Sequence, residues 1–429
     1  MRIAYFSPLP PKRTGIATYS KHMLKALASK VDLEVFDHGE TEDIGLPVHD
    51  YEEHPSLLSI AEQCDACIYH LGNNPTFHSR IREVALRLPG VLVLHDAVLY
   101  FLAAGRGPGG LLREMQACST ESSETLAKSI AFCEEVPDGN VLRHPRPEAQ
   151  PVLRSVISSA RKLLVHGETT AKLAREAGYE GAIGVVPLLC YPDAYSEVDK
   201  TLLPQIRTKL GVGPDDFLVG CFGFVASTKR PEAILRAIAQ LVKCGLPVKL
   251  MVVGIGEDIV PLVRKYGLKD RVITLGFVSD SEFQELLAAV DAVVNLRYPS
   301  MGEASATLVQ ALAHDKPCVV TDHGWFAEWS EDHVSKVSCG ENEAKEVSAI
   351  LSSWIKNPKA ACAIGVRAGN FVKERHHPDR VASMYVDAAK ETVNNSETHL
   401  SGSNILCDSG SWMANHLANR THQVMNDIL

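Results

Sequence analysis

The sequence predicts an α/β protein built from two Rossmann-like domains that face each other across a cleft. Short continuous apolar runs alternate with helical patterns twice along the chain. Such runs are typical of strands in a parallel sheet that helices cover on both faces. The chain also has 429 residues, which is long for one domain, and residues 190–204 lose all periodicity between the two series. We therefore place a linker there and expect two sheets.

The first series starts with an apolar strand at residues 3–7, followed by a loop, Gly15 and an amphipathic helix from Ile16 onward. Several later strands of this series end at a histidine. Between residues 99 and 161 the pattern is helical, with glycine-rich turns and a loop rich in proline and arginine. We interpret this part as an insertion that lines or covers the first sheet. The later strands are expected at 33–36, 66–69, 91–94 and 163–165.

The second series repeats the alternation after the linker. Strands are expected at 217–222, 248–253, 272–275, 292–295 and 318–321, and helices at 231–243, 259–266, 281–290, 306–313, 343–354 and 378–393. The predicted bounds are 1–195 for the first domain, 196–380 for the second, 381–393 for a helix that crosses back to the first domain, and 394–429 for a polar tail with a short helical candidate at 412–425.

Composition argues against several classes of protein. The formal net charge of −9 argues against a nucleic-acid partner. The 11 cysteines are scattered, and only Cys64 and Cys67 have CxxC spacing, without a second pair that would complete a zinc site. Met1 leads straight into a strand, and no apolar run reaches membrane-spanning length. We therefore expect a cytoplasmic protein without a metal site.

The segment at 296–328 is the most informative about function. It carries Arg297, then Glu303, and then the start of a helix. A helix N-terminus presents unpaired backbone N–H groups and the positive end of its dipole, so it can hold a diphosphate. A carboxylate beside it can accept hydrogen bonds from sugar hydroxyls. The segment predicts a nucleotide-sugar site, although an ordinary polar turn of a βαβ unit has the same pattern. The residues of the helix start are Ser305, Ala306 and Thr307.

A second strand–loop–helix, CFGFVASTKRPEAI, belongs to the same predicted sheet. Gly223 follows the strand, and Lys229 and Arg230 directly precede the helix. A cation at that place adds to the helix dipole in holding a diphosphate. A Lys-Arg pair alone is usually a solvated helix end, so its significance depends on the partner segment around Arg297.

Polar residues also lie at the strand ends of the first half. The loop PLPPKRTGIATYS opens a helix at Gly15, which allows either a close backbone approach to a ligand or a simple turn. His95, in VLVLHDAVLY, lies where a doubly wound domain presents functional groups. A single strand-end histidine is more often structural. Because His70 and residues 322–324 occupy further strand ends, we expect some of these positions to line the cleft.

Taken together, these residues resemble the retaining nucleotide-sugar glycosyltransferases of family 4, also called group 1, which have the GT-B fold. The resemblance covers residues 1–393 and is strongest from 222 to 328. The series FGFVASTKRP, VVGIGE, VITLGFVSD and YPSMGEASATLVQALAHDKPCVVTDHGWFAE looks like the donor domain of that family, and PLPPKRTGIATYS looks like its acceptor-side glycine loop. The resemblance implies an acceptor domain at 1–195 and a donor domain at 196–380.

The resemblance also implies roles for single residues. In the family a basic pair holds the diphosphate, which here implies Lys229. The usual arginine of that pair would fall at Phe224, so Arg230 or Arg297 is the expected substitute. Gly15 and Gly223 are expected to let the backbone approach the donor.

Two glutamates of the family motif have seven residues between them, and both positions differ in this chain. The second position is Gln310, and the first is Gly302, one residue before Glu303. Glu303 can stand in for the first glutamate only if the turn shifts. Gln310 is expected to hydrogen-bond the ribose without the charge-assisted bond of a glutamate. The departures bear on donor affinity and nucleotide identity more than on the fold.

The implied function is transfer of a sugar from a nucleoside-diphosphate sugar to an acceptor hydroxyl with retention of anomeric configuration, by a hexosyltransferase-type enzyme of glycan biosynthesis. His95, Lys229 and Glu303 are the expected catalytic residues. The donor is a co-substrate, and the resemblance implies neither a cofactor nor an obligatory metal. The implied acceptor is a glycan, a lipid-linked molecule or a small molecule.

Two other functions stay open. One is a non-catalytic sugar-nucleotide-binding or scaffold protein, which Phe224 and Gln310 favour. The other is a further GT-B enzyme such as a sugar-nucleotide epimerase, which would need no acceptor. The apolar stretch at 97–105 also has two interpretations, as a peripheral contact with the inner face of a membrane or as a buried helix.

Overall fold

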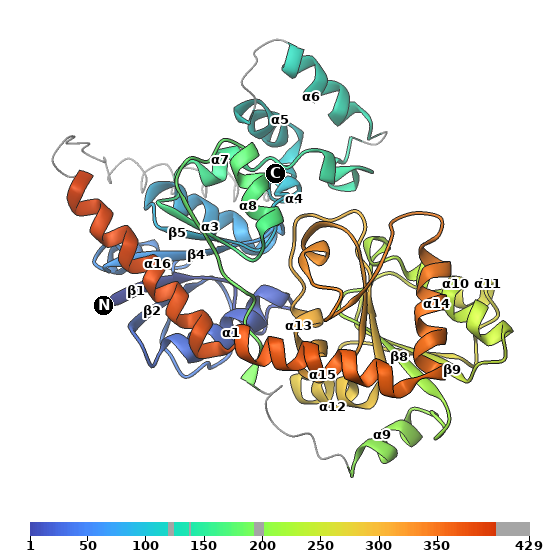
Figure 1. The fold of residues 1–429 in the computed structure, drawn as a ribbon. Coiled ribbons are helices and arrows are strands. Elements are labelled where there is room, and N and C mark those ends of the chain that lie inside the picture. The colour runs from blue at the N-terminus through green and yellow to red at the C-terminus, as the bar shows by residue number, and fades with distance from the viewer. Residues whose placement is uncertain (119–123, 137–138, 193–200, 400–429) are drawn as a thin grey trace.

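Two parallel sheets form the protein, one in each half of the chain (Figure 1). The computed structural model describes residues 1–118, 124–136, 139–192 and 201–399. Helices connect most of the successive strands in both halves. The predicted α/β class with two Rossmann-like domains is therefore confirmed.

The first sheet has the strand order β3-β2-β1-β4-β5-β6-β7, and its pairings are parallel. Alternate residues of β1 enter different cores, with Ile3 and Tyr5 in one and Ala4 and Phe6 in the other, so both faces of the sheet are covered. The strands are β1 (Arg2–Phe6), β2 (Asp32–Asp37), β3 (Val48–Asp50), β4 (Ala66–Leu71), β5 (Val91–Leu94), β6 (Lys162–Val165) and β7 (Ala182–Val185). The edge strands β3 and β7 were not predicted, because neither is a continuous buried apolar run.

The helices of the first domain divide into two groups. One group connects the strands: α1 (Gly15–Leu27), α2 (Leu58–Glu62), α3 (Pro75–Arg87) and α8 (Glu168–Glu176). The other group forms the predicted insertion after β5: α4 (Tyr100–Ala104), α5 (Gly107–Ala117), α6 (Glu124–Glu134) and α7 (Arg154–Ile157). Figure 1 shows α5 and α6 projecting beyond the sheet. The insertion has a small apolar core of its own, in which Tyr100, Leu111 and Val141 are buried.

The apolar stretch at 97–105 lies inside this part of the protein. Tyr100 is fully buried, and Leu102 and Ala104 are each 2% exposed. The buried-helix interpretation of this stretch therefore holds, and the membrane-contact interpretation of it is wrong. Among the residues that the structure describes, no helix is both long and apolar enough to cross a bilayer.

The second sheet has the order β10-β9-β8-β11-β12-β13, again with parallel pairings. Its strands are β8 (Phe217–Phe222), β9 (Val248–Val253), β10 (Val272–Leu275), β11 (Ala292–Asn295), β12 (Cys318–Thr321) and the short β13 (Ser335–Val337), which was not predicted. Its helices are α9 (Leu203–Lys209), α10 (Pro231–Lys243), α11 (Val260–Lys265), α12 (Asp280–Ala289), α13 (Ala306–Ala313) and α14 (Glu343–Lys356).

Two helices close the fold. Helix α15 (Pro358–Arg375) packs on α13, and the sequence did not predict it, because small residues rather than large apolar ones form its buried face. A Cβ at Gly365 would lie 2.0 Å from the carbonyl oxygen of Asp315, so glycine permits this close approach. Helix α16 (Pro378–His399) packs on α1 and β4. The hydroxyl groups of Tyr385 on α16 and Tyr19 on α1 are hydrogen-bonded to each other at 2.9 Å. The helical candidate at 412–425 lies outside the described residues.

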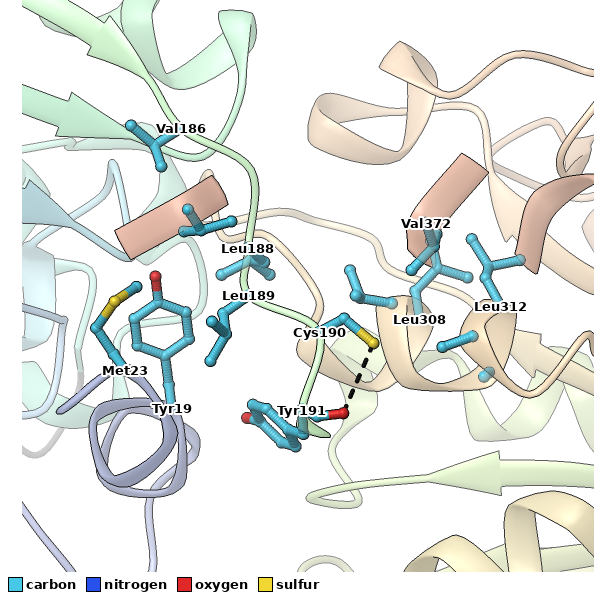
Figure 2. Packing of buried hydrophobic residues seen from close by; sticks show 14 of the residues in the cluster. Tyr19, Met23, Val186, Leu188, Leu189, Cys190, Tyr191, Leu308, Leu312 and Val372 are labelled. Atoms are coloured by element: carbon cyan, nitrogen blue, oxygen red, sulfur yellow. Dashed lines mark hydrogen bonds between the residues drawn. The ribbon is translucent and has the colours of Figure 1, made fainter. Parts of the chain in front are cut away.

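The chain crosses between the domains on a buried segment (Figure 2). Leu188 and Leu189 pack toward α1 residues such as Met23, and one apolar cluster continues from there to Leu308 and Leu312 of α13. The segment is also bonded to the junction between the two closing helices, because the Cys190 N–H donates to the carbonyl of His376, the C-cap of α15, at 2.9 Å. The two domains thus share part of one core at the crossing point.

Candidate active site

The N-terminus of α13 lies at the carboxyl end of β11 and has two unused backbone donors. Ser305 is its N-cap, and the Ser305 hydroxyl accepts the N–H of Leu308 at 3.2 Å and the side-chain amide of Asn295 at 2.9 Å. The backbone N–H groups of Ala306 and Thr307 make no hydrogen bond within the described part of the chain. The helix therefore presents two N–H groups and its positive dipole end to an anion.

Lys229 lies beside this helix start. It ends a short 3₁₀ turn (Ser227–Lys229) after β8, and its Nζ donates to the carbonyl of Phe222 at 3.1 Å. Gly223 has a φ of 93°, and a Cβ there would lie 2.6 Å from the Lys229 Nζ and 3.4 Å from the Thr307 hydroxyl. Glycine at 223 therefore makes the space in which these two groups meet.

Within the described residues, Lys229 has no ion pair. Burial, together with the neighbouring Arg297, lowers its pKa to about 7. A buried ammonium without an anion is costly, because the charged form loses its hydration. The site is therefore short of an anion.

Arg297 and Glu303 stiffen the loop between β11 and α13. The Arg297 Nε lies 3.0 Å from one carboxylate oxygen of Glu303. The other oxygen accepts the Met301 N–H at 2.6 Å and the Ser300 hydroxyl at 3.0 Å. The two terminal Nη groups of Arg297 make no hydrogen bond within the described chain, so they are free to bind a ligand.

The same loop contacts the first domain. The N–H groups of Ala97 and Val98 both donate to the carbonyl of Met301, at 2.9 and 2.8 Å, and the Thr170 hydroxyl donates to the carbonyl of Gly302 at 2.9 Å. Gly302 has a φ of 74°, and a Cβ there would lie 2.4 Å from that of Ala97. Only glycine combines this backbone angle with this contact.

A second contact between the domains supports the first. A 3₁₀ turn of the second domain (Gly324–Glu328) reaches the N-terminus of α8, where the Glu328 carboxylate accepts the N–H groups of Glu168 and Thr169 at 2.9 and 2.7 Å. The Trp325 indole N–H donates to the carbonyl of His166 at 2.9 Å. A carboxylate at a helix N-terminus is stabilised by the helix dipole. The structure is therefore a closed arrangement of the two domains.

Three histidines gather at the carboxyl ends of β4, β5 and β6. His95 Nε2 lies 2.9 Å from His70 Nδ1, and the ring centroids of His95 and His166 are 4.9 Å apart. Burial lowers the pKa of His70 and of His95 well below the usual value, and lowers that of His166 to about 4. The three rings are thus neutral at physiological pH. His95 is only half-buried, so of the three it is the one that a ligand can reach.

The sequence analysis missed Asp96. Its carboxylate accepts the Asn73 N–H at 2.8 Å, and burial together with the charge of Glu303 raises its pKa to about 7. Asp96 thus belongs to the same electrostatic cluster as Lys229, Arg297 and Glu303. Its place directly after His95, at the carboxyl end of a buried strand, was the signal that could have found it.

Some predicted residues lie elsewhere. Arg230 has a left-handed φ of 58°. Its Nε is paired with the carboxylate of Glu343, the first residue of α14, at 2.8 Å, so its charge is already neutralised within the second domain. Gln310 is 1% exposed, and its side-chain oxygen accepts the N–H of Tyr191 in the crossing segment at 3.2 Å. The Gln310 side-chain nitrogen is buried without a partner. Neither residue touches the Lys229 cluster through a contact in the structure.

The glycine loop of the first domain faces the second domain. Gly15 begins α1, with nothing within 4 Å of where its Cβ would be. Arg13 lies 5.0 Å from the ring centroid of Phe277, which follows β10. Lys12 is paired with the buried Asp37 at 2.6 Å and is not a solvated charge. Phe224 is 61% exposed and fills no core.

Comparison with known proteins places this geometry in context. Residues 204–370 match the family described as glycosyl transferases group 1. The chain is similar to the structure of Anabaena Alr3699/HepE in complex with UDP, with a TM-score of 0.66 and 17% identity over 91% of this chain and 100% of that one. The protein has the GT-B fold. The fold class predicted from the sequence is thereby confirmed, and the family match covers most of the second domain.

Relatives found by sequence alone are more distant. The chain is 24% identical to the uncharacterized glycosyltransferase YqgM of Bacillus subtilis, over 59% of this chain and 68% of that protein. It is 25% identical to a 2-deoxystreptamine glucosyltransferase of Streptomyces kanamyceticus, over 54% of this chain and 61% of that protein. It is 26% identical to a D-inositol 3-phosphate glycosyltransferase of Segniliparus rotundus, over 38% of this chain and 37% of that protein. The alignments thus span between about a third and two thirds of the relatives' own lengths.

Proposed function

We propose that the protein is a glycosyltransferase that moves a sugar from a nucleoside-diphosphate sugar to an acceptor hydroxyl. The observation that carries this proposal is the buried Lys229 ammonium without an anionic partner, beside the free N–H groups of Ala306 and Thr307. A diphosphate supplies the negative charge that this place lacks, and backbone N–H groups at a helix N-terminus bind its oxygens.

In this proposal Arg297 supplies the second cation of the diphosphate site. Its terminal Nη groups make no hydrogen bond within the described residues, and its Nε lies 3.0 Å from the Glu303 carboxylate in an ion pair. Phe224, at the position of the family's arginine, is exposed and carries no charge. Arg230 is paired with Glu343, which leaves Arg297 as the better substitute of the two that the sequence offered.

The sugar is then placed between His95 and Glu303. Neutral His95 can donate or accept a hydrogen bond, and the Glu303 carboxylate accepts hydrogen bonds from sugar hydroxyls. The contacts of Ala97 and Val98 with Met301 hold the two residues on opposite sides of the domain boundary. Closure of this kind excludes water, which would otherwise hydrolyse the donor.

We further propose that transfer retains the anomeric configuration. The bond between the anomeric carbon and the diphosphate oxygen breaks, and the acceptor oxygen bonds to that carbon from the same face. The acceptor proton passes to the departing phosphate oxygen. Lys229, Arg297 and the amides of α13 stabilise the negative charge that develops on the leaving group. The two cations supply the positive charge that a metal ion supplies in other transferases, so we propose transfer without an obligatory metal.

A binding panel tests the donor site. UDP, GDP, ADP and dTDP and their glucose conjugates are added to the protein with magnesium or with EDTA, and the melting temperature is measured. We expect the nucleotides of one of the four bases to raise the melting temperature, because a ligand that binds only the native state stabilises it by mass action. We expect the same rise in EDTA. A conjugate that is turned over without an acceptor to an isomerised sugar favours an epimerase instead. A panel without any rise favours the scaffold protein.

Proton uptake tests the state of Lys229. With a pKa of about 7 in the free protein, Lys229 is mostly neutral at pH 8. A bound diphosphate favours the charged form, so binding of a nucleoside-diphosphate sugar should take up close to one proton at pH 8, and affinity should fall as pH rises from 7 to 9. Calorimetry in buffers of different ionisation enthalpy measures the proton count. The same titration with Lys229→Ala should show the uptake lost; an unchanged count would assign the proton to another group.

A further inference from the structure

Asp96 has a carboxylate oxygen that the fold does not use. One oxygen, Oδ2, accepts the Asn73 N–H at 2.8 Å, and this is the carboxylate's single hydrogen bond within the described residues. The other oxygen, Oδ1, has no hydrogen-bond partner among the described residues but is accessible to solvent, and the residue is only half-buried. Oδ1 is therefore open to a ligand.

Asp96 lies where the insertion, the first sheet and the loop between β11 and α13 meet. The side-chain oxygen of Asn73 accepts the N–H groups of Phe101 and Leu102 at 2.8 and 3.2 Å, and so fixes the start of α4. The N–H of the next residue, Ala97, donates to the carbonyl of Met301 in the β11–α13 loop at 2.9 Å. An acceptor that reaches the sugar from the first domain therefore meets Asp96.

Charge at this place favours a cationic acceptor. In the donor complex Lys229 and Arg297 supply two positive charges, and Glu303 supplies one negative charge before Asp96 is counted. A nucleoside-diphosphate sugar adds two negative charges to this group. The cluster is then negative, so it attracts an ammonium group and repels a phosphate group at short range.

Several basic residues of the first domain are already paired with carboxylates. Lys12 is paired with Asp37, and Arg82 and Arg106 both with Glu114. Arg146 is likewise paired with Glu135 on the insertion. A phosphorylated acceptor that used one of these four residues would have to break its ion pair first.

We propose that Asp96 binds the acceptor, and that the acceptor is a polyol with an amino group rather than a phosphate group. The inference rests on the proposed transfer and adds the class of the second substrate. The relatives include proteins named for each kind of acceptor, an aminocyclitol and an inositol phosphate, so their names do not decide between them. In this chain the unused oxygen of Asp96 and the negative charge of the donor complex favour the amine.

The test measures acceptor binding to the protein saturated with the nucleoside diphosphate that raises its melting temperature most. 2-Deoxystreptamine, myo-inositol and D-myo-inositol 3-phosphate are titrated in turn by calorimetry. We expect the amine to bind about tenfold more tightly than inositol, which is the ratio that one charge-assisted hydrogen bond gives, and the phosphate to bind least. Tightest binding of the phosphate, equal binding of the three, or no binding of the amine would overturn the inference.

Asp96→Asn is the decisive variant, because asparagine can still accept the Asn73 N–H. We expect it to weaken amine binding by about tenfold or more while it leaves inositol and the nucleoside diphosphate within about twofold. Asp270→Asn, which removes an exposed carboxylate without any contact in the structure, should change none of them. If Asp96→Asn loses the nucleoside diphosphate as well, Asp96 serves the donor and the inference fails. If no nucleoside diphosphate binds even the wild type, the proposed function fails instead.

The pH dependence gives an independent measurement. Burial and Glu303 raise the pKa of Asp96 to about 7, so its carboxylate loses its charge as pH falls below that value. Amine affinity should then fall between pH 8 and pH 6 in the wild type and stay level in Asp96→Asn. The other groups around Asp96 are His95, Glu303, Arg297 and Lys229. His95 stays neutral because its pKa is well below that range, and Lys229, whose pKa of about 7 lies in it, is expected to stay charged because the nucleoside diphosphate is bound. Equal pH profiles in the two proteins would overturn the assignment.

Discussion

Replacing Lys229 with alanine is expected to reduce sugar transfer by on the order of a hundredfold to a thousandfold, which is the usual effect of removing one group that stabilises charge on a leaving group. The Lys229 Nζ is the buried cation that faces the free N–H groups of α13. Alanine removes the charge without filling the space beside Gly223. Release of nucleoside diphosphate in the presence of donor and acceptor measures the rate, and a thermal shift with the nucleoside diphosphate measures the remaining affinity.

Three further variants make this result specific. Lys243→Ala removes an exposed cation of the same domain and should leave transfer unchanged. Arg297→Ala should lose transfer to an extent comparable with Lys229→Ala, whereas Arg230→Ala should mainly lower stability, because it leaves the buried carboxylate of Glu343 unpaired. Wild-type turnover in Lys229→Ala would show that the diphosphate binds elsewhere. Loss of transfer in Arg230→Ala with Arg297→Ala active would exchange the roles of the two arginines.

Replacing Gly302 with alanine is expected to lower transfer by on the order of a hundredfold while nucleoside-diphosphate binding stays near that of the wild type, since a misplacement of about 1 Å can have this effect on a reaction. A Cβ there would lie 2.4 Å from that of Ala97, across the domain boundary, so the loop must move away from the first domain. The proposed diphosphate site is built from the second domain alone. Separate measurements of transfer and of nucleoside-diphosphate affinity check the expected split.

Gly267→Ala is the matched control for this variant. Gly267 has a φ of 67°, close to that of Gly302 at 74°, but nothing lies within 4 Å of its Cβ position. Both variants therefore carry the same kind of backbone strain, of about 1 kcal/mol, and only one carries the clash. Equal activity of the two variants would mean that closure at Gly302 is not needed for transfer.

The sequence by itself was sufficient for the buried central strands and for the elements that carry the proposed diphosphate site. Continuous apolar runs such as 217–222 and 292–295 are strands because parallel strands are buried on both faces, and this burial is a local property of the residues. The carboxyl ends of β8 and β11 meet because these strands are neighbours in the sheet. Lys229, Arg297 and Ser305 could therefore be predicted to come together, and the two open alternatives for the second cation could be named.

Only the tertiary structure decided which of these side chains face the same place. Arg230 and Arg297 are equally basic in the sequence, but Glu343, 113 residues after Arg230, pairs with one of them. Gln310 bonds Tyr191 of the crossing segment, and Asp96 comes next to Glu303 through contacts of the first domain with Met301 and Gly302. Periodicity reports how a residue relates to its own helix or strand. Charge pairing, burial and closure depend on partners far along the chain, and they exist only once both domains have folded and met.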